Sequence, residues 1–209
     1  YFDSESSVHF GNISIFKFYC NKVNNLNIND ALYYSVEKEC KSIAKYIIDN
    51  YLDKRIKLSQ SYVYKLLSNS INLKSSYIFN YLIDKFQSVD TKLLDSEDKI
   101  KLLSESCYSN KVEIGMKITD LILEQNTNEK LIDFTLPFFN AADSGSSGLC
   151  QYLIDKKVFI DFDLLSFQVQ NLAFIKKDVL DIIIKNMTKI AKDTFISCYL
   201  KNAICAKNK

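Results

Sequence analysis

Adjacent apolar residues recur in pairs along this chain, and a second pair often follows the first after four residues. The clearest cases are Ile43-Ala44 with Ile47-Ile48, Ile78-Phe79 with Leu82-Ile83, and Leu149-Cys150 with Leu153-Ile154. Residues four apart lie on one face of an α-helix, so each set forms a single apolar stripe. A helix with one such stripe is stable only when another element covers it, and the recurrence therefore predicts helices that cover one another in series.

The stretch from Thr135 to Asp161 shows this pattern most completely, because it adds the turn signals. It holds the only proline of the chain, Pro137, and a proline suits the first turn of a helix. Phe138 and the Ala141-Ala142 pair follow at helical spacing, and Gly145 can end the helix in a left-handed conformation. The stretch therefore predicts a short helix, a tight turn and a second short helix.

Composition favours the same fold class. The 209 residues include only 4 glycines and 1 proline, too few for the many turns of a sheet-rich protein. Hydrophobic residues make up 47% and charged residues 25%, which is typical of a globular protein. The net charge of +2 gives no strong field that would favour nucleic acid or an anionic membrane. No apolar run reaches the ~18 residues of a membrane span.

The chain divides into approximate units: a partial unit 1–29, then 30–60, 61–94, 95–134, 135–162 and 163–187, and a cap at 188–209. In the second unit, Asp30 is expected to cap a helix over Ala31–Lys38. Glu39 there replaces the turn glycine, which predicts a turn that is either strained or slightly rebuilt. In the sixth unit, Leu164-Leu165 and Val169 are expected to mark the first helix.

The unit over 135–162 resembles an ankyrin repeat. Pro137-Phe138 matches the Pro-Leu of that family, Ala141-Ala142 its paired alanines, Gly145 its glycine, and Leu149-Cys150 with Leu153-Ile154 its two apolar pairs. When Tyr19, Ile47, Leu82, Leu121, Leu153 and Ile182 are taken as equivalent, the steps are 28, 35, 39, 32 and 29 residues. Tetratricopeptide and HEAT repeats have periods near this mean, so the short helices, the Thr-Leu-Pro-Phe start and the alanine pair favour ankyrin. The expected fold is an all-α solenoid of stacked helix-turn-helix, ankyrin-like repeats.

The resemblance implies a non-catalytic protein–protein interaction module or scaffold that recognises another protein through a concave groove. First-helix and turn residues would line this groove, and tyrosines there offer a large contact area at a low entropy cost. The residues expected to bind the partner are Tyr33, Tyr34, Glu37, Tyr62, Tyr64, Asn140 and Asp143. Two alternatives stay open: a structural subunit of a large assembly, or the regulatory or substrate-recruiting region of an enzyme whose catalytic part lies outside this chain.

No residue pattern indicates catalysis, a cofactor, a metal or a small-molecule substrate. His9 is the only histidine and lies in a polar segment. The stretch from Ser144 to Gly148 lacks the Lys-Ser/Thr of a phosphate-binding loop and is interpreted as the turn between helices. The six cysteines form no CxxC pair and are expected to be free thiols, which indicates a reducing, cytoplasmic compartment. Since the sequence starts at Tyr1, it is expected to be a fragment or a processed piece of a longer chain.

Overall fold

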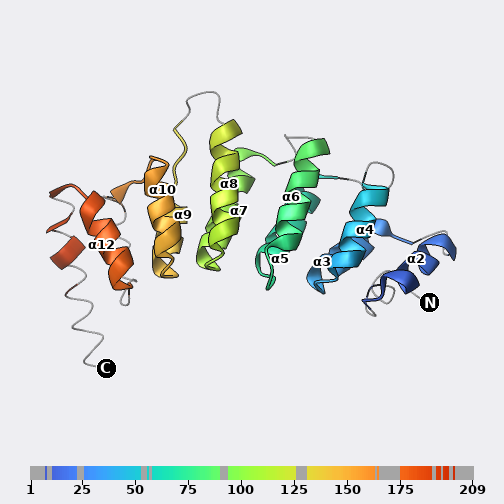
Figure 1. Ribbon diagram of the computed structural model, residues 1–209. Helices are drawn as coiled ribbons and strands as arrows, with labels where there is room; N and C mark the ends of the chain where they lie inside the picture. Colours follow the sequence, from blue (N-terminus) through green and yellow to red (C-terminus); the bar gives the residue numbers. More distant parts are fainter. Residues whose placement is uncertain are drawn as a thin grey trace. The chain divides into compact units, whose positions relative to one another are not determined.

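The computed structural model describes residues 8, 11–22, 26–52, 56, 58–89, 94–125, 131–162, 164, 175–189, 192–193, 195–197 and 200 (Figure 1). Within these residues the regular structure is α-helical and no strand occurs, which confirms the expected all-α class. Among the described residues, one isolated parallel bridge joins Asp133 and Phe159.

The chain forms two compact units, residues 1–98 and residues 99–209. The first holds α2 (Ile13–Lys22), α3 (Ile28–Glu37), α4 (Lys41–Tyr51), α5 (Gln60–Ile71) and α6 (Tyr77–Val89). The second holds most of α7 (Ser96–Tyr108), then α8 (Val112–Gln125), α9 (Thr135–Asp143), α10 (Ser147–Asp155) and α12 (Lys177–Asn186).

Two helix pairs build most of the first unit. Helix α3 packs against α4 and α5 packs against α6. Each pair also contacts the next one, because α3 lies against α5 and α4 lies against α6, while α2 covers the other side of α4. The first helices of the pairs thus form one layer and the second helices another (Figure 1).

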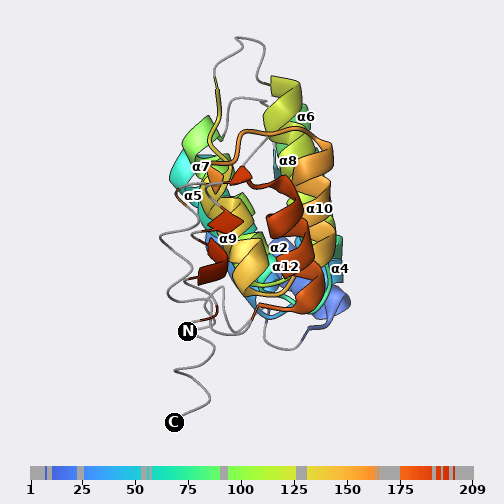
Figure 2. The ribbon, with the colours of Figure 1, turned by 90° about the vertical axis from the view of Figure 1, so that its left-hand side faces the viewer.

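In the second unit, α10 is the central helix and contacts α8, α9 and α12; α9 and α10 lie side by side in Figure 2. The approach of α8 to α10 is close at Gly115. A Cβ atom built on Gly115 would lie 2.7 Å from Leu149 Cδ2 and 3.2 Å from Ser106 Oγ. This helical glycine therefore has a packing role, which offsets its low helix propensity.

Three helix pairs close with the same backbone turn. Its central residue has a positive φ at Glu39 (53°), Asn110 (52°) and Gly145 (72°). In each case the backbone N–H of the residue after the central one donates to the carbonyl five residues before it, at 2.8 Å. The N–H of the central residue donates to the carbonyl three residues before it. This is the Schellman arrangement. The strain predicted at Glu39 is confirmed, because a left-handed conformation is costly for a residue with a Cβ.

This turn fixes which residues are equivalent and corrects one expected anchor. We count eight positions from the central residue of each turn. This gives Ile47 after Glu39, Ile118 after Asn110, and Leu153 after Gly145. With Leu82 the series steps by 35, 36 and 35 residues, so Ile118, and not Leu121, is the equivalent position. Leu121 is also buried and lies one helical turn later, which made the two residues indistinguishable by hydrophobicity.

A buried serine repeats in the same frame. Ser35, Ser70 and Ser106 are fully buried, and each Oγ donates to the carbonyl three residues earlier at 2.7 Å. The spacing is again 35 and 36 residues. Each hydroxyl is satisfied within its own helix, so a small polar side chain can lie in the core at little cost.

The predicted apolar stripes are buried in both units. These positions include Leu32, Val36, Ile43, Ile47, Leu66, Leu67, Ile78, Phe79, Leu82, Leu102, Leu103, Phe138, Ala141, Ala142, Leu149, Cys150 and Leu153. As predicted, α9 contains Pro137 near its start and residues 144–146 form the turn to α10.

Three local expectations were wrong. Asn27, rather than Asp30, caps α3, and its side chain accepts from the backbone N–H groups of Asn29 and Asp30. Asn and Asp cap helices equally well, and starting α3 at Ile28 buries one more apolar residue. Ile15, which with Phe16 was expected to match the apolar pair Leu149-Cys150, is exposed, and so is Leu164. Leu165 and Val169 lie outside the described residues.

Candidate interaction surface

The predicted partner-binding tyrosines lie on the first helices of unit 1. Tyr33 and Tyr34 on α3 are half-buried, and their rings meet edge to face with centroids 5.8 Å apart. The ammonium of Lys65, from α5, lies 4.4 Å from the centroid of Tyr33. Glu37 follows one turn later on α3 and is exposed. Since α3 packs on α5, these side chains belong to one continuous surface.

Tyr62 has a structural role that the sequence did not reveal. Its hydroxyl donates to the carbonyl oxygen of Asn29 at 2.6 Å and so links α5 to α3. Burial, with a smaller contribution from the charge of Asp30, raises the pKa of Tyr62 above its ordinary value. The Tyr62 hydroxyl therefore serves the packing of α5 on α3. Tyr64, on the same helix, is half-buried.

Two further predicted residues, Asn140 and Asp143, belong to α9 in unit 2. The Asn140 side-chain amide donates to the carbonyl of Ser104 at 3.3 Å, which joins α9 to α7. Asp143 ends α9 and is exposed. Asn140 therefore contributes to packing, and Asp143 is the more accessible of the two.

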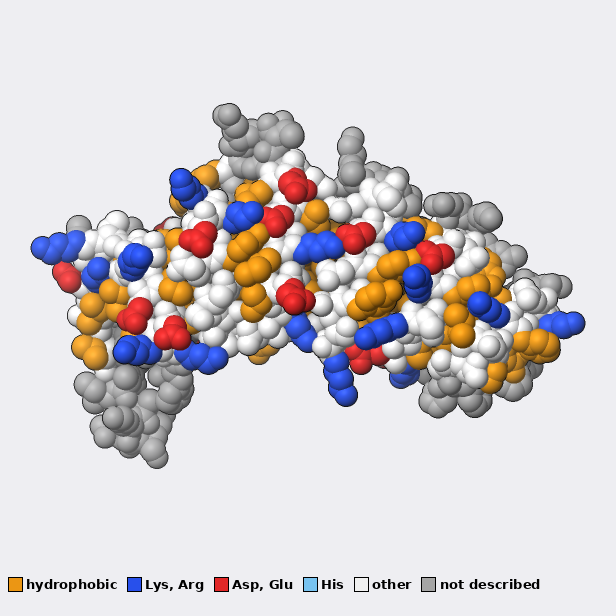
Figure 3. Space-filling model, in the orientation of Figure 1, with side chains coloured by type: hydrophobic (Ala, Val, Ile, Leu, Met, Phe, Trp, Pro, Cys, Tyr) orange, Lys and Arg blue, Asp and Glu red, His pale blue; other side chains and the backbone are white. Residues whose placement is uncertain are grey.

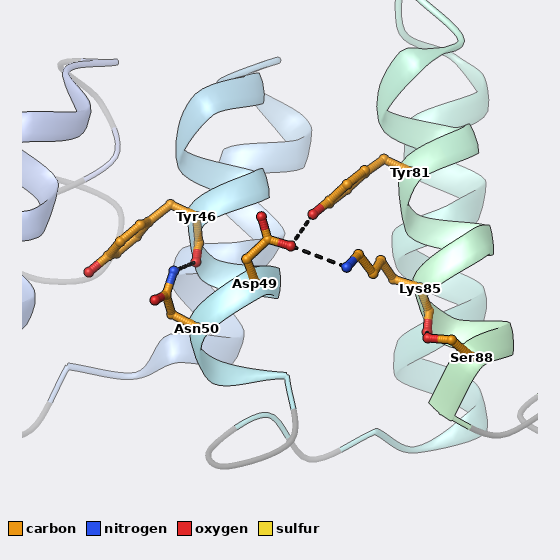
Figure 4. Close-up of polar contacts among 6 residues, drawn as sticks. All are labelled: Tyr46, Asp49, Asn50, Tyr81, Lys85 and Ser88. Atoms are coloured by element: carbon orange, nitrogen blue, oxygen red, sulfur yellow. Dashed lines mark hydrogen bonds and ion pairs between the residues drawn. The ribbon is translucent and has the colours of Figure 1, made fainter.

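The second helices of unit 1 carry a polar cluster that was not predicted, the Asp49 cluster of Asp49, Tyr81 and Lys85 (Figure 4). Asp49 projects from α4 and accepts a hydrogen bond from the Tyr81 hydroxyl. The Lys85 ammonium, one turn further along α6, lies 3.4 Å from the same carboxylate. The hydrogen bond from Tyr81 is the largest cause that holds the pKa of Asp49 below its ordinary value, with Lys85 and Lys45 adding to it against a cost of burial.

The same constellation occurs in unit 2 as the Asp120 cluster of Asp120, Tyr152 and Lys156. The Tyr152 hydroxyl lies 2.7 and 2.8 Å from the two carboxylate oxygens of Asp120, and the Lys156 ammonium lies 2.6 Å from one of them. Burial raises the pKa of Asp120, but the hydrogen bonds from Lys156 and Tyr152 outweigh it, so the pKa is lowered. In both clusters the tyrosine follows the aspartate after 32 residues.

The repetition indicates that this trio joins one second helix to the next. A sequence signal exists, because Asp49, Asp84, Asp120 and Asp155 recur at steps of 35, 36 and 35 residues. It becomes visible only once the turns have fixed the repeat frame.

A second group of side chains lies beside the Asp49 cluster and is here called the lysine–tyrosine patch: Lys41 and Lys45 of α4 with Tyr77 and Tyr81 of α6. The two tyrosine rings are stacked, with centroids 6.1 Å apart and planes 7° from parallel. The Lys41 ammonium lies 5.9 Å from the Tyr77 centroid, and that of Lys45 lies 5.8 Å from Tyr81. Figure 3 shows lysine ammonium groups among hydrophobic side chains over α4 and α6.

Removal of the Asp49 carboxylate is expected to cost little and to change the acid sensitivity of unit 1. Asp49 and Tyr81 are both partly exposed, so a double-mutant cycle of Asp49→Asn and Tyr81→Phe should give a coupling of about 0.5 kcal/mol. Because the folded pKa of Asp49 is lowered, this stabilisation is complete above the unfolded pKa of about 3.9 and is lost as pH falls through the folded pKa. Urea titrations between neutral pH and acid measure both effects. Glu37→Gln is the control: Glu37 is an exposed carboxylate on the other layer of helices, and its removal should show no coupling with Tyr81→Phe.

The four cysteines that the structure describes show no sign of activated chemistry. Cys20, Cys40, Cys107 and Cys150 are free thiols, the last two buried. Burial raises the pKa of Cys150 to about 12, so this thiol is protonated at neutral pH and a poor nucleophile. His9, Cys198 and Cys205 lie outside the described residues.

Two further kinds of feature are absent from the described ranges. None of their helices has both the length and the apolar character needed to cross a membrane. No group of three or more His, Cys, Asp or Glu side chains among them is placed to hold a metal ion.

In comparisons with known proteins, no family model, curated protein or solved structure matches the chain.

Proposed function

We propose that this chain is a non-catalytic, ankyrin-like helical-repeat protein that binds another protein in the cytoplasm. The observation that carries the proposal is the repeated construction of the helix pairs. The same inward positions recur at steps of 35 or 36 residues, and the same Schellman turn closes three of the helix pairs. In such a construction the buried positions specify the fold, and the outward positions of the first helices can serve recognition.

The surface proposed for the partner is formed by α3 and α5. Tyr33, Tyr34 and Tyr64 present partly exposed aromatic area, and Glu37 adds an exposed carboxylate. Tyrosine is enriched among the residues that dominate binding energies. Tyr62 supports this surface from within through its bond to Asn29. Asn140 and Asp143, which lie on α9 of unit 2, are also proposed to bind the partner. The free thiols support a reducing compartment.

Partner capture with the intact chain tests this proposal. Wild-type protein and a Tyr33→Ala/Tyr34→Ala variant are immobilised, and proteins captured from cells that contain the chain are quantified by mass spectrometry. The amount of a specific partner captured by the variant should be about tenfold or more below the amount captured by the wild type, because aromatic hot spots contribute about 2 kcal/mol or more.

Tyr108→Ala is the matched control, because Tyr108 is exposed and lies outside the proposed surface. Circular dichroism of each variant establishes that the helices remain folded. Equal capture by the wild type and the Tyr33→Ala/Tyr34→Ala variant would reject recognition through this surface. Capture of several proteins in a fixed ratio, unchanged by either substitution, would instead favour a structural subunit of a large assembly.

A further inference from the structure

The lysine–tyrosine patch differs from the rest of the second-helix surface in one informative way. The Asp–Tyr–Lys cluster occurs in both units, but the patch occurs only on α4 and α6 among the described helix pairs. In the frame set by the turns, Val112 and Met116 of α8 take the places of Lys41 and Lys45, and Gly148 takes the place of Tyr77. Joining two second helices therefore does not require Lys41, Lys45 or Tyr77, and these side chains are available for another role.

The charge of the patch is only partly balanced by the fold, since Lys45 acts on the Asp49 carboxylate without forming an ion pair with it. Among the residues that the structure describes, neither Lys41 nor Lys45 forms an ion pair; their ammonium groups contact tyrosine rings instead. The carboxylate of Asp49 is already engaged by Tyr81 and Lys85. An ammonium over an aromatic ring keeps its charge and can bind an anion on its open side.

The flat part of the patch is apolar. Tyr77 is 44% exposed, and its ring lies parallel to that of Tyr81 one helical turn away. Two stacked rings form a surface against which an aliphatic side chain can pack. A ligand that fits must therefore bring negative charge and an apolar group together.

Spacing selects the form of this ligand. Lys41 and Lys45 are four residues apart on one helix, a rise of about 6 Å. Side chains two residues apart on one edge of an extended peptide are about 6.8 Å apart. Carboxylates at positions i and i+2 of an extended segment therefore match the spacing of Lys41 and Lys45 along the helix.

We infer that the α4–α6 face binds an acidic, extended segment of a partner protein, in which two carboxylates separated by one residue meet Lys41 and Lys45 while a neighbouring apolar side chain packs on Tyr77 and Tyr81. The inference rests on the proposed function in that the ligand belongs to another protein. It uses a different layer of helices from α3 and α5.

Fluorescence polarisation with the intact 209-residue chain tests the inference. The probe is a fluorescein-labelled peptide with an Asp-Leu-Asp core flanked by Gly, Ser and Leu, compared with the same peptide carrying Asn-Leu-Asn. At low ionic strength the acidic peptide should bind about tenfold more tightly than its amide counterpart, since two exposed ion contacts are gained. Affinity for the acidic peptide should fall as salt is raised.

The decisive variant is Lys41→Gln/Lys45→Gln, which should weaken binding of the acidic peptide about tenfold. Lys177→Gln/Lys185→Gln on α12 removes the same charge from an exposed helix elsewhere and should leave affinity within about twofold of wild type. Tyr77→Ser should weaken binding of the acidic peptide without abolishing its preference over the amide form. Circular dichroism checks that each variant keeps its helices.

Three outcomes would overturn the inference. One is equal affinity for the acidic and amide peptides, and another is an equal loss in the two lysine variants. The third is displacement of the peptide by inorganic phosphate, at constant ionic strength, as effectively as by unlabelled acidic peptide. None of these outcomes bears on partner capture through Tyr33 and Tyr34, so failure of the inference is separable from failure of the proposed function.

Discussion

Replacing Phe79 by alanine is expected to lower the free energy of unfolding by about 3–5 kcal/mol. Phe79 lies on α6 with no exposed surface, where α6 packs against both α4 and α5. The substitution removes buried aromatic area and leaves a cavity that three helices cannot all move to fill. Urea denaturation followed by circular dichroism at 222 nm gives the measurement.

Phe18→Ala is the matched control for this experiment. Phe18 is also an aromatic residue of unit 1, but it is 60% exposed on α2. Its removal should cost less than about 1 kcal/mol. Similar costs for the two phenylalanines would contradict the placement of Phe79 at the junction of the two helix pairs.

The second large effect is expected in unit 2, where Leu153→Ala should cost about 2–5 kcal/mol. Leu153 is fully buried on α10, the helix that contacts α8, α9 and α12. Truncation there loosens the packing of a helix with three neighbours. The same denaturation experiment, or the change in melting temperature, reports the loss.

Leu136→Ala provides the comparison, because Leu136 lies on α9 and is 54% exposed. Its cost should stay below about 1 kcal/mol. If Leu153→Ala were equally mild, the apolar pair Leu149-Cys150 and Leu153-Ile154 would not form a buried stripe, and the repeat frame itself would be wrong.

The sequence predicted the helix faces well because burial imposes a strict period. A residue that must face the core recurs every three or four positions, and Ile43, Ile47, Leu149 and Leu153 follow this rule. Capping imposes a weaker rule. Asn27 and Asp30 are both good caps, and only the burial of Ile28 decided between them. The anchor in α8 was misplaced for a similar reason, because Ile118 and Leu121 are equally apolar.

The turns and the polar clusters were harder to predict, for different reasons. A left-handed turn is recognised from glycine, so Gly145 was predicted, whereas Asn110 adopts the same conformation with a side chain. The Asp49 cluster joins residues 32 positions apart, and no local pattern indicates that Asp49 and Tyr81 meet. The tyrosines of α3 and α5 were singled out, but those of α6 were not.

The common turn at Glu39, Asn110 and Gly145 has a consequence for how such a chain can change over generations. The backbone enters and leaves each turn along the same path, so a genetic crossover at these residues would fuse the leading helix of one hairpin to the trailing helix of another with no gap in the backbone. Whole hairpins could be gained or lost by the same exchange. Such an exchange would keep the backbone continuous, and its cost would lie in repacking the two joined helices, because the helices of a hairpin pack on each other in α3–α4 and α9–α10.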